Sequence, residues 1–159
     1  MEKVKIGGIL QARGLASIGV TGIPDRPGVA SRIFLTLANH RINVEFIVHA
    51  MDARGQSHVT FCVDRKHLEE SLSHMDRHRE EIGGAHILHH RDMAIVSIFG
   101  PHFRERHGIA GTFFNALGSA KINIIAISTS VSTVSCLIAE KDLPTAVAAL
   151  SQAFELPGG

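Results

Sequence analysis

The stretch that decides the fold is residues 20–50, VTGIPDRPGVASRIFLTLANHRINVEFIVHA. Its first four residues, 20–23, form a short apolar segment that predicts a strand. Residues 24–28, rich in proline and glycine, predict a turn. The apolar residues that follow recur three and four positions apart, which predicts one buried helix face: Val29, Ile33, Phe34 and Leu37. Residues 44–49 predict a second strand, so the stretch folds as strand, turn, helix and strand.

The turn before the helix carries the chemistry of this stretch. Asp25 is a good N-cap residue, Pro27 suits the first helical turn, and Gly28 lets the backbone approach a guest closely. A helix start presents free N–H groups and a partial positive charge, so it can hold a carboxylate or a phosphate. A helix that is merely well capped has the same pattern, and the stretch alone leaves both interpretations open.

The same stretch returns about 80 residues further on. The matches fall on the turn glycine, on the apolar helix face and on the Ile-Asn entry to the next strand. Gly28, Ala30, Phe34, Leu37, Ile42, Asn43 and Ile47 correspond to Gly108, Ala110, Phe114, Leu117, Ile122, Asn123 and Ile127. A repeat of this length predicts two copies of one module.

Composition limits the possible classes of protein. The chain has 159 residues, 45% of them apolar, which is enough for one domain or two small ones. A net charge of +1 argues against a nucleic-acid partner. The sequence shows neither a membrane-spanning apolar run nor a signal-peptide pattern, and we expect a cytoplasmic protein with no membrane partner. Cys62 and Cys136 lie in strand-like runs, so we expect two buried free thiols.

The remaining segments predict the same order of elements twice. In the first copy we expect strand 15–23, the opening helix, strand 44–50, a hairpin turn at 51–55, strand 57–63, helix 64–82 ended by Gly83-Gly84, and strand 85–89. In the second copy we expect strand 94–100, helix 107–120, strands 123–130 and 133–139, and helix 144–155.

The second copy lacks a fourth strand after its last helix. Residues 3–10, KVKIGGIL, predict a strand that belongs to no element of the first copy, followed by a turn at 11–14. Because an unpaired sheet edge is a liability, we expect this strand to complete the second sheet. The predicted domains are therefore residues 15–91, and residues 3–10 together with 93–156, with the first domain inserted in the second.

The predicted order of elements is the ferredoxin-like βαββαβ arrangement, an α+β fold. With PDRPGVA at 24–30, INVE at 42–45, INI at 122–124 and ISTS at 127–130, the chain resembles the paired ACT domains of aspartate kinases over residues 3–156. The resemblance implies two ACT modules with no catalytic residue, metal or cofactor of their own. They would be either the regulatory region of an aspartate kinase or its separately translated small subunit.

The resemblance also implies a role. Such domains bind end-product amino acids, here lysine, threonine or both, and turn down an aspartate kinase domain or subunit, and we expect a homodimer. The effector would lie between modules, against the turn after one module's first strand and the start of a neighbouring module's second strand. The implied effector-binding residues are Asp25, Arg26, Pro27, Gly28, Val29, Ala30, Asn43, Val44, Glu45, His49, Asn123, Ile124, Ser128 and Thr129.

The chemistry of these residues suits an amino acid. Backbone N–H groups at 28–30 can hold its carboxylate, and Asp25 and Glu45 can accept from its ammonium group. We expect residues 122–124 of the second module, from the same chain or a partner, to close this site. The sequence departs from the family's pattern at His107 in place of Pro27, Ile125 in place of Glu45, Val131 in place of a common Glu, and His49-Ala50 in place of a usual Gln-Asn pair. These departures predict unequal sites, with the Asp25 turn filled first.

Other constellations indicate no further chemistry. Glu70, His74 and His78 share a predicted helix face, and such side chains can bind zinc, but their charged neighbours indicate a solvated surface. Ser128 to Ser130 have no histidine and acid at a spacing that would imply a nucleophile. A second class of function stays open, that of a stand-alone ACT-type amino-acid-sensing or interaction protein with another partner.

Overall fold

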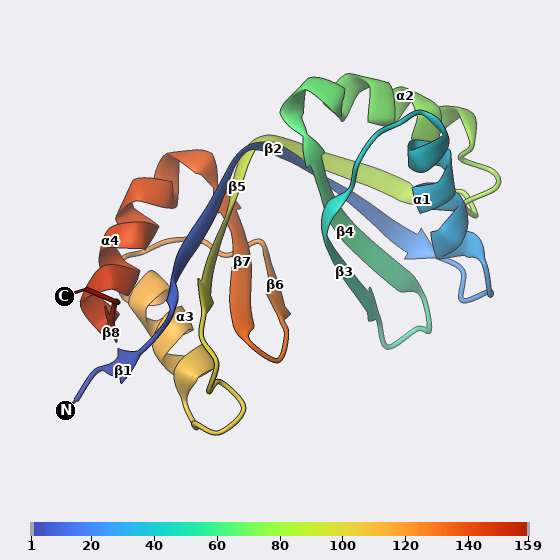
Figure 1. Ribbon diagram of the computed structural model, residues 1–159. Coiled ribbons are helices and arrows are strands. Elements are labelled where there is room, and N and C mark those ends of the chain that lie inside the picture. Colours follow the sequence, from blue (N-terminus) through green and yellow to red (C-terminus); the bar gives the residue numbers. More distant parts are fainter. Residues whose placement is uncertain (1, 159) are drawn as a thin grey trace. The chain divides into compact units, whose positions relative to one another are not determined.

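The computed structural model describes residues 2–158, which form two compact units (Figure 1). One unit consists of Gly14–Asp92. The other consists of the residues up to Arg13 together with those from Met93 onward, so the first unit interrupts it in sequence.

The unit Gly14–Asp92 is a four-stranded sheet with two helices on one side (Figure 1). Its strands lie in the order β3-β4-β2-β5, and β4 is antiparallel to both β3 and β2. The elements are β2 (Gly8–Ile23) from Gly14 on, α1 (Val29–Asn39), β3 (Glu45–Met51), β4 (Ser57–Asp64), α2 (Leu68–Arg77) and β5 (His86–Phe99) up to Asp92. This order confirms the predicted βαββαβ fold.

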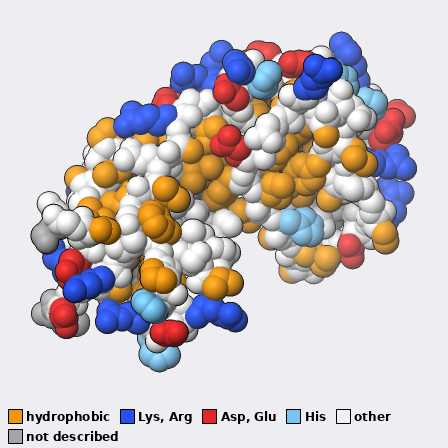
Figure 2. Space-filling model, viewed as in Figure 1, with side chains coloured by type: hydrophobic (Ala, Val, Ile, Leu, Met, Phe, Trp, Pro, Cys, Tyr) orange, Lys and Arg blue, Asp and Glu red, His pale blue; other side chains and the backbone are white. Residues whose placement is uncertain are grey.

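The core of this unit lies between its sheet and its helices. Alternate residues of β2 and β4 point into it, while α1 contributes Ile33 and Leu37, which are at most 1% exposed. Phe34 of α1 meets Phe61 of β4 edge to face, with ring centroids 5.4 Å apart. Helix α2 buries Leu68 and Met75, and charged side chains gather over α2 in Figure 2. Its amphipathic pattern therefore holds α2 on the sheet.

The other unit repeats this arrangement. Its strands lie in the order β2-β5-β7-β6, and the N–H of Gly7 donates to the carbonyl of Phe99 over 2.6 Å. The N-terminal strand thus completes this sheet, as the sequence predicted. The elements are β2 up to Arg13, β5 from Met93, α3 (Ile109–Ser119), β6 (Ala126–Thr129), β7 (Thr133–Ala139) and α4 (Leu143–Ala153), with β1 (Val4–Lys5) paired in parallel to β8 (Phe154–Glu155).

The repeat extends to backbone conformation. The first helix of each unit ends on a basic residue in the left-handed region, Arg41 at φ 58° and Lys121 at φ 60°. In each case the next N–H, that of Ile42 or Ile122, donates 3.0 Å to the carbonyl of a helix leucine five residues back. Both helices therefore stop in the same way before the Ile-Asn entry to a strand.

Several predicted boundaries are wrong. The turn expected at 11–14 does not form, because β2 is one 16-residue strand whose two halves belong to different units. The helix expected at 64–82 is a short 3₁₀ turn at Arg65–His67 followed by α2, which stops at Arg77. The strand expected at 3–10 divides into β1 and the start of β2.

Both cysteines are free and buried, as predicted. Burial raises the pKa of the Cys62 thiol to about 12, and the Glu45 carboxylate adds to this rise. Burial also raises the pKa of the Cys136 thiol to about 12. Within residues 2–158 no helix is long and apolar enough to cross a membrane.

Both thiols should be unreactive in the folded chain, because the thiolate is the nucleophile and neither thiol ionises near neutral pH. A thiol-reactive disulfide reagent at pH 8 should label neither cysteine in the native protein. In denaturant it should label the two cysteines that the chain contains. Rapid labelling without denaturant would contradict the burial of these side chains.

Candidate functional site

The turn between β2 and α1 is closed by a left-handed glycine. Gly28 is the N-cap of α1, with φ 92° and ψ −9°, a conformation that costs glycine little. Before it, the N–H of Arg26 donates to the carbonyl of Pro24 over 2.8 Å. The chain thus reverses within a few residues and starts α1 next to the end of β2.

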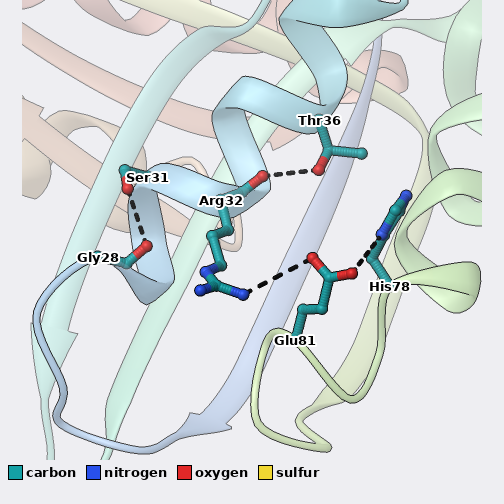
Figure 3. A network of polar contacts seen from close by, with 6 residues as sticks. All are labelled: Gly28, Ser31, Arg32, Thr36, His78 and Glu81. Carbon is teal, nitrogen blue, oxygen red and sulfur yellow. Dashed lines mark hydrogen bonds and ion pairs between the residues drawn. The ribbon is translucent and has the colours of Figure 1, made fainter.

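The start of α1 lacks the side-chain cap that the sequence predicted. Asp25 lies ahead of the helix, Pro27 is outside it, and no side chain of residues 2–158 accepts a hydrogen bond from its first turn. The reason is the left-handed Gly28, which takes the N-cap position itself. Ser31 donates from Oγ to the Gly28 carbonyl over 2.8 Å (Figure 3), so its hydroxyl adds no cap. The N–H of Val29 donates to the carbonyl of Arg26 over 3.5 Å, whereas those of Ala30 and Ser31 have no acceptor within the helix and remain available to a guest.

A hollow of about 350 Å³ opens at this helix start. It brings together the six predicted residues of the turn and the predicted His49 from β3. Its lining is Ile23, Pro24, Asp25, Arg26, Pro27, Gly28, Val29, Ala30, His49 and Ser57. The hollow therefore combines N–H donors, one carboxylate, one guanidinium, one imidazole and one hydroxyl, which suits a small zwitterion.

The structure places three other predicted residues of this unit away from the hollow. Asn43 is exposed between α1 and β3, and Val44 packs against the core. Glu45 begins β3 opposite Cys62, and a bulge follows in which Phe46 has φ 58°. Glu45, the predicted second carboxylate, is thus at the start of β3, whereas the residue of β3 that lines the hollow is His49.

A histidine and an aspartate that the sequence analysis missed support the floor of the hollow. Asp52 Oδ1 accepts from the N–H groups of Arg54 and Gln56, and its Oδ2 lies 2.9 Å from His58 Nε2. The other ring nitrogen of His58, Nδ1, accepts from the N–H of Gly22 over 3.2 Å. Nε2 therefore carries the hydrogen and donates to Asp52, and the β3–β4 hairpin is fixed to the end of β2.

The signals for this support were present in the hairpin. Gly55 has φ 77°, and Asp52, directly after β3, lies across the turn from His58 of β4. Ser57, which also lines the hollow, pairs with Ile23 after a register shift in β2. That shift depends on Gly22 at φ 72°, and periodicity alone does not reveal it.

The other unit has a counterpart hollow with different chemistry. Helix α3 starts at Gly108, with φ 82°, and the adjacent hollow measures about 270 Å³. Of the predicted residues in this unit, Thr129 lines it, whereas Asn123, Ile124 and Ser128 do not. Its lining is Phe103, Arg104, Arg106, Gly108, Ile109, Ala110, Thr129, Ser130, Val131 and Val134. Among these described residues none is an acid, so the hollow suits the carboxylate of a ligand better than its ammonium group.

Asp76 and Arg77 of the histidine-rich helix α2 are exposed, as its sequence indicated, but His74 is not part of this solvated surface. His74 is 8% exposed and stacks on His40 of α1, with ring centroids 3.4 Å apart. Its Nε2 lies 3.5 Å from the Glu70 carboxylate. Residues 2–158 bring no group of three or more His, Cys, Asp or Glu side chains into an arrangement that could hold a metal ion.

Comparison with known proteins places this architecture in a family. The pattern of the ACT domain family matches residues 17–78 and 96–154. An aspartate kinase of Pseudomonas putida is 37% identical over 156 residues, which are 98% of this chain and 38% of that protein. The chain thus spans 38% of the length of such curated relatives.

Solved structures agree with this placement. The ligand-free regulatory subunit of aspartate kinase from Thermus thermophilus is similar with a TM-score of 0.84 and 31% identity, over 94% of this chain and 99% of that one. A chain in a structure of aspartokinase alpha and beta subunits gives a TM-score of 0.84 and 34% identity, over 93% and 97%. The chain thus consists of two ferredoxin-like modules, each with an uncapped helix start beside a hollow. The chain belongs to the ACT domain family and is homologous to the regulatory regions of aspartate kinases.

Replacing Asp52 should loosen the hairpin in a pH-dependent way. The hydrogen bond from His58, and those from Gln56 and Arg54, hold the pKa of Asp52 below its usual 3.8. The ionised carboxylate therefore stabilises the folded state above that pH, and this stabilisation is lost as pH falls through the lowered pKa. Asp52→Asn should lower the urea midpoint at pH 7 and lower it less at pH 3. An equal difference at both pH values would contradict this.

Proposed function

We propose that this chain is the regulatory part of an aspartate kinase and that it binds end-product amino acids at the Asp25 turn. Membership of the family supports the regulatory role. The single observation that carries the site is the uncapped start of α1, which opens into a hollow containing a carboxylate. Lysine, threonine or both are the proposed effectors, and feedback inhibition of aspartate phosphorylation is the proposed outcome.

The hollow's groups divide naturally between the two ends of an amino acid. The N–H groups of Ala30 and Ser31 belong to the first turn of α1 and can donate to the carboxylate, which the helix dipole also favours. Asp25 lies at the rim and can accept from the ammonium group. His49 and Ser57 are left to contact the effector's side chain.

The chain's other surfaces support a homodimer as the assembled form. Strands β3 and β6 are edge strands in their sheets. Both carry exposed apolar side chains, with Ile47 and Met51 of β3 at 50% and 55% exposure and Ile127 of β6 at 45%. Exposed apolar edges favour pairing with a second copy. The kinase domain or subunit is the second proposed partner, and two free thiols support a reducing, cytoplasmic location.

Substitution of Asp25 tests the site. Asp25→Ala should weaken binding of lysine or threonine in calorimetry, because the ammonium group loses its charged acceptor. The loss of one such hydrogen bond corresponds to a rise in Kd of roughly tenfold. His107→Ala, at the matching turn of the other unit, is the control and should matter less. Equal effects of both variants, or none from Asp25→Ala, would refute the assignment.

Sedimentation tests the proposed assembly. At tens of micromolar, a range typical for such measurements, the chain should sediment as a dimer, with and without added amino acids. Ile47→Lys should shift it towards monomer, because a charge on an edge strand opposes pairing. Ser73→Lys on α2 is a matched exposed control. A monomer under all these conditions would argue against the dimer.

A further inference from the structure

The loop after α2 lies directly against the proposed effector turn. Gly83 of this loop packs on the ring of Pro24, so a Cβ at position 83 would overlap Pro24 Cδ and lie 2.7 Å from Pro24 Cγ. The same Cβ would lie 3.8 Å from the Arg26 guanidinium. Pro24 and Arg26 both line the hollow at the start of α1. The backbone at Gly83 is thus the back wall of the turn.

This wall is held in place by its own loop. The N–H groups of Ile82, Gly83 and Gly84 donate to carbonyls of residues 78–80 over 3.2, 3.1 and 2.9 Å. The side chain of Ile82 is 2% exposed and belongs to the core of the unit. Gly83 and Gly84 both have left-handed φ angles, 81° and 70°. A loop with a buried anchor and closed hydrogen bonds has little freedom to retreat from a bulkier residue at position 83.

A chain of polar contacts joins the same loop to α1 (Figure 3). Glu81 lies between Arg32 of α1, at 3.7 Å, and His78 at the end of α2, at 3.2 Å. These side chains are well exposed, so the ion pairs contribute little stability. The Arg32–Glu81 ion pair nevertheless joins this loop to α1. The contact of Gly83 with Pro24 is close-packed, and it determines where the turn can lie.

We propose that Gly83 is a positioning residue for the amino-acid site. Its missing side chain allows the α2–β5 loop to set the place of Pro24, and through Pro24 the place of the N–H groups at the start of α1. The ligand side of this statement rests on the proposed function, whereas the steric side rests on the packing alone. Any event that shifts the end of α2 would alter the effector site through this contact.

The other unit has no such wall. Its second helix, α4, ends at Ala153 and continues at once into β8 at Phe154. Among the described residues of that unit, no glycine follows α4 before Gly158, so nothing corresponds to Gly83 at the end of its second helix. The positioning therefore acts on the Asp25 turn, and it distinguishes the two units independently of their charged residues.

The chain supplies a matched pair of variants. Gly83→Ala and Gly84→Ala both place a Cβ on a left-handed residue, so both carry a similar backbone strain. A Cβ at Gly84, however, has no described atom within 4 Å. In amide NMR spectra of the full chain, Gly83→Ala should move the resonances of Arg26, Gly28 and Ala30, and Gly84→Ala should leave them in place.

The same pair should separate in ligand affinity. With lysine and threonine as probes in calorimetry, Gly83→Ala should raise the Kd roughly tenfold, because a displaced turn loses a charge-assisted hydrogen bond. Gly84→Ala should bind as the parent chain does. Adding Pro24→Ala to Gly83→Ala removes the Cγ and Cδ atoms that the new methyl group would strike. This double variant should return the turn resonances towards those of the parent chain.

Three results would overturn the inference: equal turn shifts in the two glycine variants, no turn shift in Gly83→Ala, or no rescue by Pro24→Ala. If Gly83→Ala does not fold, Pro24→Ala alone decides, since it must move the Gly83 amide resonance if the two residues are packed together. A parent chain that binds neither amino acid refutes the proposed function. The NMR comparison then still decides whether Gly83 positions the turn.

Discussion

The left-handed glycine at the start of the first helix is the constraint from which each unit is built. Gly28 and Gly108, at φ 92° and 82°, turn the chain back at the end of a central strand. The next residue, Val29 or Ile109, then falls on the buried face of a helix that covers the sheet. A side chain at either glycine would strain the backbone, and the helix would start at a different angle. The same geometry leaves N–H groups in the first helical turn without an acceptor in the helix, so the fold and the proposed binding site have one origin.

The loops that lead to these two glycines differ in length and in charge between the two units. In the unit Gly14–Asp92 the loop from Pro24 to Gly28 is short, stiffened by two prolines and supported by Gly83. In the other unit the connection from β5 to α3 is longer, and it lines its hollow with Arg104 and Arg106. A short supported loop with an acid suits a zwitterion that needs both charges satisfied. A longer cationic loop suits a carboxylate alone.

Sequence patterns foretold those parts of the fold that depend on local periodicity and on the repeat. Helix faces such as Ile33 and Leu37, the Gly55 hairpin and the N-terminal strand that completes a sheet all followed from these patterns. Patterns failed where tertiary pairing overrides local preference. Residues 11–14 read as a turn, yet they continue β2 because strands flank both of its halves.

The site was harder to predict than the fold for the same reason. The turn residues and His49 meet in one hollow, but Glu45, which directly precedes a bulge at Phe46, is not among the residues that line it. The hydrogen bonds of Asp52 and His58 join a hairpin to Gly22. The contact of Gly83 with Pro24 comes from the loop after α2. Contacts of this kind join residues distant in sequence, and no local period marks them. The contact of His74 with His40 of α1 is of the same kind, since nothing in the local pattern marks that one histidine of α2 as buried.

An uncapped helix start has a thermodynamic consequence. Relative to a side-chain cap, a glycine N-cap costs a helix only roughly a few tenths of a kcal/mol, so α1 is slightly less stable than it would be with a capping side chain. A guest that accepts hydrogen bonds from this start restores what the cap would have given. It thereby stabilises the folded unit in proportion to the logarithm of its concentration over its Kd. Because Ile82 anchors the α2 loop in the same core and Gly83 abuts Pro24, this stabilisation extends to the helix that begins at the turn and to the loop behind it. A guest at the turn would therefore be coupled to the order of α1 and of the loop after α2, and coupling of this kind is what the proposed regulatory role requires.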